Sequence, residues 1–151
     1  MDPLRLRTPE NDAVLAYLET EQLPSWRESD SPWIVDGYSL STHPDLCERV
    51  EALAASAGGE FGWLYGRPVV VAERGTIVAF GAGTHIFCLR LPREECGPLV
   101  VTREDPPAKH PLLRRKQLEL EALVAGEWTR VDPWPAGASD ALAAAIRRAR
   151  P

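Results

Sequence analysis

The stretch from Arg67 to Leu91, RPVVVAERGTIVAFGAGTHIFCLRL, constrains the fold of this chain more than any other part of it. The apolar runs VVVA and IVAF lie on either side of Arg74-Gly75, and Gly81-Ala82-Gly83 separates the second run from an alternating segment, residues 84–91. Short apolar runs between glycine-containing turns are typical of antiparallel strands. The stretch therefore predicts an antiparallel meander with turns at residues 74–75 and 81–83.

The predicted strands differ in how their apolar residues are spaced. In the first two the apolar residues are continuous, which predicts strands covered on both faces. In residues 84–91 apolar and polar residues alternate, so that Thr84 and Arg90 share one partly polar face and His85 points the other way. We expect a ligand or partner to bind at this strand, and the candidate residues are Thr84, His85 and Arg90.

Three further segments carry the signals of amphipathic helices. Pro9, Pro44 and Ser139 stand near their starts, where proline or a capping hydroxyl is favoured, and apolar residues recur behind them at helical spacing. We predict helices at residues 9–22, 43–57 and 139–149. A fourth segment, residues 111–125, favours a helix by composition but also fits the spacing of a strand.

The remaining apolar segments predict short strands at residues 61–65 and 128–131, an edge strand at 33–40 broken at Asp36-Gly37, and a further strand at 99–101. Together these elements predict an α+β fold with an antiparallel sheet of about four to six strands and flanking helices. The chain is 151 residues long, the size of one domain. We expect a single domain, with a loop-rich extension at residues 1–42 and an α+β core at residues 43–151.

Composition excludes several classes of protein. The chain is 44% hydrophobic and 26% charged, as ordinary globular domains are. Three cysteines cannot all pair, and no apolar segment has the length of a secretion signal or a membrane span. We therefore expect reduced thiols and a cytoplasmic protein that does not associate with membranes. Cys96, between Glu95 and Gly97, is expected to be the more exposed thiol.

Motifs for catalysis or cofactor binding are missing from the sequence. The glycines at 81–83 precede a strand pattern, whereas a phosphate-binding loop precedes a helix. His85 and Cys88 are three residues apart on a strand and so lie on opposite faces, while His43 and Cys47 share a helical face without a further ligand nearby. We expect no metal site and no cofactor.

The one basic cluster, KHPLLRRK at residues 109–116, is followed by Glu119 and Glu121. The net charge of the chain is -5, so the cluster is interpreted as a solvated helix face, and nucleic-acid binding is not expected.

The helix segment DLCERVEAL, the hairpins GRPVVVAERGTIVAFGAGTHIFCLRLP, Trp128 to Val131 and a closing helix follow one another over residues 43–149. This order resembles the small α+β domains of the TfoX amino-terminal and YjbR-like group. The resemblance implies an antiparallel meander with flanking helices and no assigned catalytic residue. Phe61-Gly62 stands where that group often has Met-Phe-Gly, and the first 40 residues have no counterpart.

Two hypotheses of function follow, with a third behind them. The first is a non-enzymatic module that binds a ligand or a protein, as a homodimer or with another partner, through its sheet. The alternative is a small hydrolase or transferase that uses a histidine (His43, His85 or His110) with a cysteine or carboxylate. The third is a regulator linked to nucleic acid.

Overall fold

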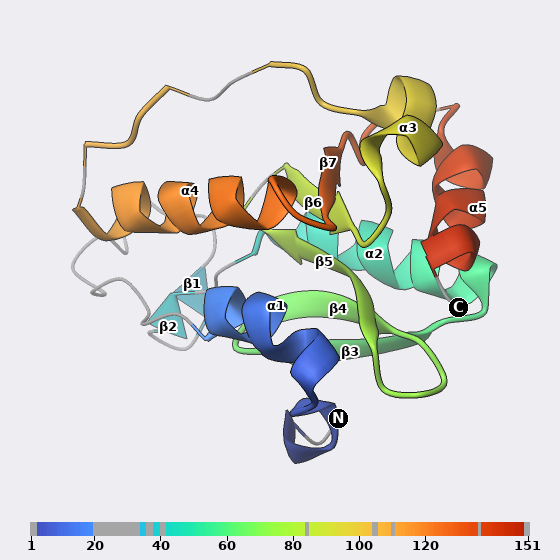
Figure 1. The fold of residues 1–151 in the computed structure, drawn as a ribbon, viewed down its shortest axis with the longest axis horizontal. Coiled ribbons are helices and arrows are strands. Elements are labelled where there is room, and N and C mark those ends of the chain that lie inside the picture. Colours follow the sequence, from blue (N-terminus) through green and yellow to red (C-terminus); the bar gives the residue numbers. More distant parts are fainter. Residues whose placement is uncertain are drawn as a thin grey trace.

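A computed structural model describes residues 3–19, 34–35, 38–39, 42–83, 85–103, 106–109, 111–135 and 137–149. Its centre is a five-stranded antiparallel sheet in the order β3-β4-β5-β6-β7 (Figure 1). The strands are β3 (Glu60–Leu64), β4 (Arg67–Val71), β5 (Ile77–Ala82), β6 (Ile86–Leu89) and β7 (Thr129–Val131). The predicted α+β fold with an antiparallel sheet and flanking helices is confirmed.

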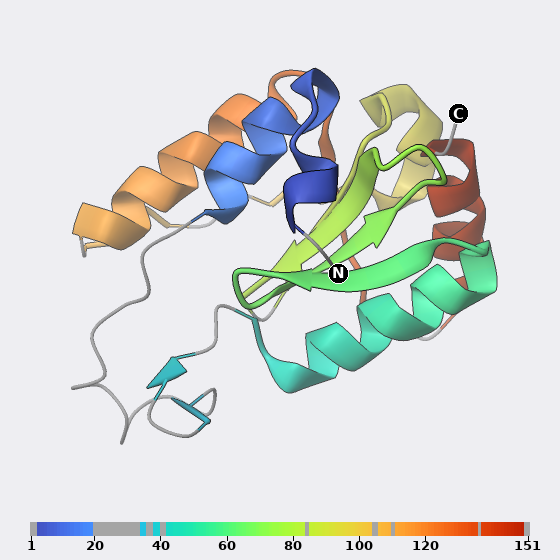
Figure 2. The ribbon, with the colours of Figure 1, turned by 90° about the horizontal axis from the view of Figure 1, so that it is seen from below.

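Helices cover both faces of the sheet (Figures 1 and 2). On one face lie α2 (Pro44–Ala57) and α5 (Ser139–Ala149). On the other lie α1 (Asp12–Leu18) and α4 (Pro111–Val124). Two 3-10 turns, η1 (Pro3–Leu6) and η2 (Pro9–Asn11), precede α1. A short helix, α3 (Arg93–Cys96), and the turn η4 (Gly97–Leu99) follow β6. No described helix is long and apolar enough to cross a membrane.

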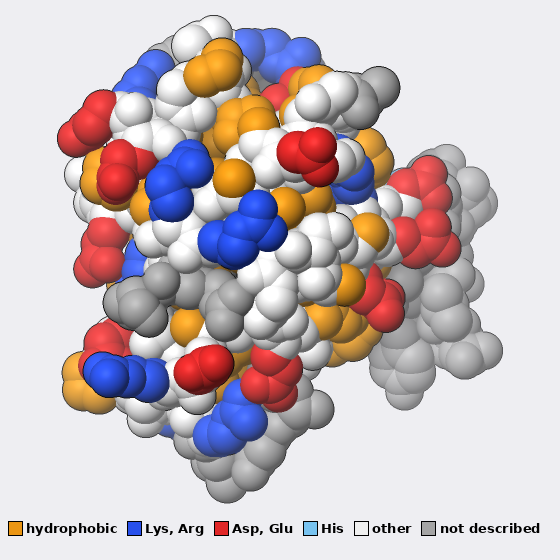
Figure 3. Space-filling model, turned by 90° about the vertical axis from the view of Figure 1, so that its right-hand side faces the viewer, with side chains coloured by type: hydrophobic (Ala, Val, Ile, Leu, Met, Phe, Trp, Pro, Cys, Tyr) orange, Lys and Arg blue, Asp and Glu red, His pale blue; other side chains and the backbone are white. Residues whose placement is uncertain are grey.

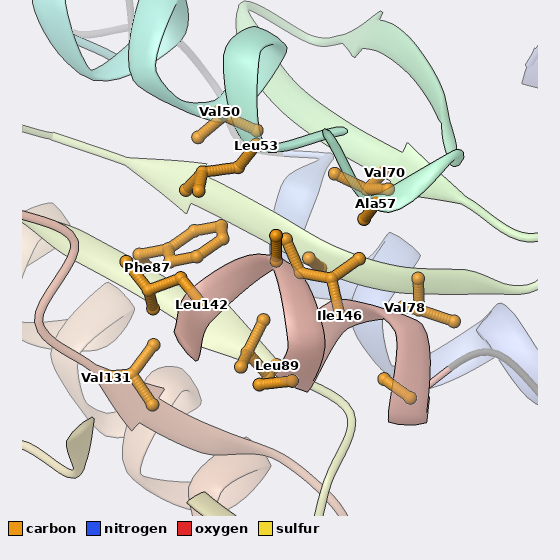
Figure 4. Close-up of a cluster of buried hydrophobic side chains, with 14 of the residues drawn as sticks. Val50, Leu53, Ala57, Val70, Val78, Phe87, Leu89, Val131, Leu142 and Ile146 are labelled. Atoms are coloured by element: carbon orange, nitrogen blue, oxygen red, sulfur yellow. The ribbon is translucent and has the colours of Figure 1, made fainter. Parts of the chain in front are cut away.

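Each face of the sheet has its own hydrophobic core. The α2–α5 face is filled mainly by leucine, valine, isoleucine and alanine side chains together with Phe87, and Figure 4 shows Leu53, Leu142 and Ile146 converging on it from the two helices. The opposite face buries Leu6, Leu18 and Phe80 among others. All residues of β4 and β5 are buried, which confirms that the central strands are covered on both faces.

The helix predicted at residues 43–57 is confirmed as α2. Both of its ends are capped as the sequence predicts. At the start, the backbone N–H of Asp45 donates to Nδ1 of His43 at 3.0 Å. At the end, Gly58 has a φ of 71° and so accommodates the left-handed turn that stops the helix. Arg49 then ties α2 to the start of α5 through the Ser139 hydroxyl at 2.7 Å.

Two predicted boundaries are wrong. The helix expected at residues 9–22 is a 3-10 turn followed by α1, which ends at Leu18. The turn expected at 81–83 is mostly strand, since β5 continues through Ala82. A glycine fits at position 81 because β4 and α2 both come close to it: a Cβ there would lie 3.1 Å from the Pro68 side chain and 3.3 Å from the Val50 side chain.

Two of the short strands differ as well. Residues 34–35 and 38–39 (β1 and β2) pair with each other in a separate two-stranded ladder and are not an edge of the main sheet. Of residues 99–101, Val100 makes an isolated bridge with Val131. The segment therefore covers the outer side of β7 without forming a full strand.

Candidate interaction surface

The structure does not bring together His85 and Arg90, the two predicted site residues that it describes. Thr84 lies outside the described residues. His85 precedes β6 and is partly buried, whereas Arg90 comes directly after its other end. Because each strand residue advances the chain by about 3.3 Å, the Cα atoms of His85 and Arg90 are roughly 16 Å apart. Arg90 therefore has a different environment from His85.

Arg90 is held in a network that fastens the amino-terminal segment to the sheet. Its Nε donates to the Ile77 carbonyl at 2.8 Å, and its Nη1 donates to the Glu10 carbonyl at 2.8 Å and to the Glu127 carboxylate at 3.3 Å. The guanidinium also lies 4.7 Å from the centre of the Trp128 ring. Arg90 therefore stabilises the packing of the amino-terminal segment, on the face of the strand that was predicted to be partly polar.

Asn11 is the partner of Arg90 that sequence reasoning missed. It is 0% exposed, and its amide donates to the carbonyls of Leu6 and Gly75 at 2.7 and 2.9 Å. Its Oδ1 accepts from the Ile77 N–H at 2.9 Å and from Arg90 at 3.3 Å. The only signal in the sequence was an amide side chain next to the apolar stripe of a predicted helix.

The described thiols are buried, which argues against a nucleophilic role at neutral pH. Burial raises the pKa of Cys47 to about 11 and that of Cys88 to about 12. The prediction of a more exposed Cys96 is wrong: it is 2% exposed, because α3 turns its side chain into the core of the α2–α5 face. Burial also raises the pKa of the Cys96 thiol.

Histidine chemistry finds little support among the described residues. Nδ1 of His43 accepts the helix-capping hydrogen bond from Asp45. His110 lies outside the described residues. Within the described part of the chain, no group of three His, Cys, Asp or Glu side chains has an arrangement that could hold a metal ion.

The basic cluster at residues 109–116 begins helix α4, where its charges meet nearby acids and backbone. Lys116 donates to the carbonyl of Tyr17 at 3.0 Å and to the carboxylate of Glu119 at 2.6 Å, so it ties α4 to α1. Arg115 lies 4.0 Å from the same carboxylate. The fourth segment is a helix, and this part of its surface mixes basic with acidic groups.

The outer side of β3 presents a different kind of surface, which we call the β3 edge (Glu60–Leu64). Strand β3 ends the sheet and pairs with β4 alone among the described strands. Figure 2 shows it running along the near side of the molecule, between α1 and α2. A strand at the end of a sheet leaves a row of backbone N–H and C=O groups available to another strand.

Aromatic side chains line the α2 side of the β3 edge. Phe61 and Trp63 pair with Val70 and Pro68 of β4, and their rings meet edge to face with centroids 6.0 Å apart. Trp63 is 47% exposed, which is unusual for the largest hydrophobic side chain. The sequence FGWLY predicted this strand but not its position at the end of the sheet.

Tyr65 closes the hairpin that follows β3, in a conformation that side-chain-bearing residues rarely adopt. Its φ is 53°, in the left-handed region, where a residue other than glycine loses on the order of 1 kcal/mol. Its hydroxyl donates to the Glu19 carboxylate at 3.0 Å, which holds the hairpin against the end of α1.

Each end of the β3 edge carries a neutral ion pair. Arg5 and Glu60 are 2.7 Å apart at one end, and Arg7 and Glu19 are 2.6 Å apart at the other, beside Tyr65. Hydrogen bonds from Tyr65 and Arg7 lower the pKa of the Glu19 carboxyl. The charges around the edge therefore cancel locally.

Other exposed hydrophobic side chains are scattered. Leu118 and Val124 lie on α4, and Trp134 lies in the turn before α5. On the side of the molecule that carries α5, Figure 3 shows small hydrophobic patches separated by charged side chains of both signs. An open depression beside α3 is lined by Arg93, Glu94, Gly97, Pro98, Val100 and Thr102.

Comparisons with protein-family models, with curated proteins and with solved structures found no match to this chain.

Proposed function

We propose that this protein is a non-enzymatic, cytoplasmic binding module that adds an extended strand of a protein partner to its β3 edge. The observation that carries the proposal is the edge strand β3, which pairs with β4 alone among the described strands and exposes Trp63 as well as Glu60. Edge strands usually bear lysine, proline or a bulge, which discourage pairing. In peptide recognition by strand addition, main-chain hydrogen bonds provide affinity and side chains beside the edge provide selectivity.

The proposal moves binding from the face of the sheet to its edge, because helices cover both faces. We also propose that the chain is related to the TfoX amino-terminal and YjbR-like domains. The support for this relation is the arrangement of a meander with flanking helices. The enzyme alternative is less well supported, since the described thiols are buried and His43 caps a helix. Loss of a screened activity in a folded His43, His85 or His110 variant would restore it.

Peptide selection tests the proposed function. A phage-displayed library of random linear peptides is selected on the folded full-length protein, and the bound peptides are mapped by NMR. We expect peptides that perturb the amide signals of residues 60–65 and that lose binding at least about tenfold to Trp63→Lys, because a charged side chain on an edge opposes pairing.

Leu118→Lys is the matched control. Leu118 is 48% exposed and Trp63 is 47% exposed, so both substitutions place lysine on a half-exposed hydrophobic position. Peptide binding should be unchanged in this variant. Selected peptides that bind Trp63→Lys as tightly as the original protein would overturn the proposal, as would signals that move only on α4 or α5.

A further inference from the structure

We infer that the strand accepted by the β3 edge is β3 of a second copy of this chain, in an antiparallel pair related by a two-fold axis through Gly62. This inference rests on the proposed function and names its partner. It would join two five-stranded sheets into one continuous sheet.

The backbone N–H and C=O groups of β3 point alternately toward β4 and away from it. Leu64 and Arg67 face each other across a two-residue turn, and Tyr65 and Gly66 have φ values of 53° and 76°, as in the type I′ turns of tight hairpins. The pair that closes such a turn is hydrogen-bonded, and hydrogen-bonded and open pairs alternate along an antiparallel ladder. Phe61 and Trp63 therefore belong to the open pairs, and their N–H and C=O groups point away from β4.

The direction of these groups favours one register between two copies of β3. Two outward-facing residues, Phe61 and Trp63, flank Gly62. With the two-fold axis at Gly62, Phe61 of each copy lies opposite Trp63 of the other, and the two pairs form about four interstrand hydrogen bonds. A two-fold axis at Phe61 or at Trp63 would match outward-facing groups less completely, because residue 59 or 65, outside the strand, would then have to pair.

Side chains favour the same register. Phe61 and Trp63 lie on one side of the sheet, and a two-fold axis perpendicular to the sheet keeps that side common to both copies. The register therefore builds a cluster of four aromatic rings from the exposed Trp63 and the partly buried Phe61 of each copy, and cross-strand aromatic pairs each stabilise by roughly 0.2–1 kcal/mol. Gly62 has no side chain to collide at the axis, as expected where backbones approach closely.

The charges permit two identical edges to meet. Antiparallel pairing places the Arg5–Glu60 end of one edge beside the Arg7–Glu19 end of the other. Each end is a neutral pair, so the approach of a second copy brings no like-charge repulsion, although the whole chain carries a net charge of -5. The contact is small, and we expect a weak dimer that depends on concentration.

Sedimentation equilibrium of the full chain over a concentration series tests the inference. The original protein and Leu118→Lys should dimerise with the same dissociation constant to within about twofold, and Trp63→Lys should weaken dimerisation at least about tenfold. In amide hydrogen exchange, the N–H groups of Phe61 and Trp63 should be protected in concentrated samples and should lose protection on dilution.

Trp63→Pro provides a second variant. The Trp63 N–H points outward, so proline removes one interface donor without removing a bond to β4, and we expect a folded monomer. The inference is overturned if the chain stays monomeric at all concentrations, if dimerisation is unchanged in a folded Trp63→Lys, or if Phe61 and Trp63 exchange rapidly in a dimer. If peptides bind the β3 edge of a protein that stays monomeric, the inference of self-pairing is wrong and the proposed function is retained. If the protein forms a β3-dependent dimer and selects no peptide, self-pairing is supported and the binding of other proteins at this edge is contradicted.

Discussion

The two faces of the sheet are covered by different means. On the α2–α5 face two long helices, of 14 and 11 residues, pack hydrophobic side chains against β4, β5 and β6. On the other face α4 also has 14 residues, but α1 has only 7, and the amino-terminal segment before α1 is held by the buried Asn11 and by Arg90. Short elements cannot bury enough apolar area to stay in place by packing alone, so polar anchors complete the second layer.

This difference leads to an expectation about cooperativity. Hydrophobic packing on the α2–α5 face is shared among many side chains, so damage there should lower the stability of the whole domain. On the α1–α4 face, polar side chains such as Asn11 and Arg90 hold the amino-terminal segment in place. Damage to them should release the amino-terminal segment before the rest of the molecule unfolds.

The largest effect is expected from Phe87→Ala. Phe87 is 0% exposed in the core of the α2–α5 face, and removing a buried phenyl ring costs about 3–5 kcal/mol of unfolding free energy. Denaturant unfolding measures the loss, which should appear equally in fluorescence and circular dichroism. Leu118→Ala, on an exposed position, should change the free energy by less than about 0.5 kcal/mol. A loss below about 1 kcal/mol in Phe87→Ala would show that the core relaxes around the missing ring.

Asn11→Ala should have a smaller but more local effect. It leaves the Ile77 N–H and the carbonyls of Leu6 and Gly75 without their side-chain partner, and a loss of about 2–4 kcal/mol is expected. Hydrogen exchange should accelerate more in α1 than in α2. Asp12→Ala, at the exposed neighbouring position, should cost less than about 1 kcal/mol. Equal acceleration in both helices would contradict the proposed difference between the faces.

Arg90→Lys should lower the unfolding free energy by about 1–2 kcal/mol. Lysine keeps the charge opposite Glu127 but cannot donate to Ile77, Glu10 and Asn11 at once, because it lacks the planar fork of donors. Thermal unfolding measures the change. Arg115→Lys on the exposed surface of α4 is the control and should be neutral. If Arg90→Lys and Arg115→Lys unfold at the same temperature, the hydrogen bonds that only arginine can make at position 90 add no measurable stability.

The elements of the α2–α5 face could be predicted from the sequence, because their signals are local. Pro44 and Gly58 mark the ends of α2, and the apolar stripe after Ser139 marks α5. Gly81 misled the prediction, since a glycine between apolar residues is typical of a turn. Its small size serves a contact with Val50, more than 30 positions away, which no local pattern contains.

The candidate site was less predictable than the fold because it depends on contacts between residues that are far apart in the sequence. Alternation predicted a partly polar strand face that includes Arg90, but which layer covers that face depends on α1 and α4, which are distant in sequence. The aromatic residues Phe61 and Trp63 were visible from the start. Their exposure depends on β3 being the end strand, which is a property of strand order and not of the strand itself.

The smallest expected effect is the loss of stability at high pH. Tyr17 and Cys88 lie in the α1–α4 core, and burial raises the pKa of each to about 12. Their ordinary values are about 10 and about 9, so the unfolded chain releases these protons at lower pH than the folded chain does. Stability should therefore be independent of these groups below pH about 8, and it should fall as pH rises from about 9 towards 12.

Denaturant unfolding at a series of pH values measures this slope. The folded state binds more protons than the unfolded state above pH about 9, so the unfolding free energy must decrease with pH. In Cys88→Ala the free energy should be lower at every pH, because a buried group is lost, but its decline between pH about 8 and about 10 should be shallower. Thiol-reactive reagents should modify Cys88 only as the domain opens. A slope that Cys88→Ala leaves unchanged would assign the alkaline loss to Tyr17 and to the other buried thiols, Cys47 on α2 and Cys96 in the α2–α5 core, and so to both faces of the sheet.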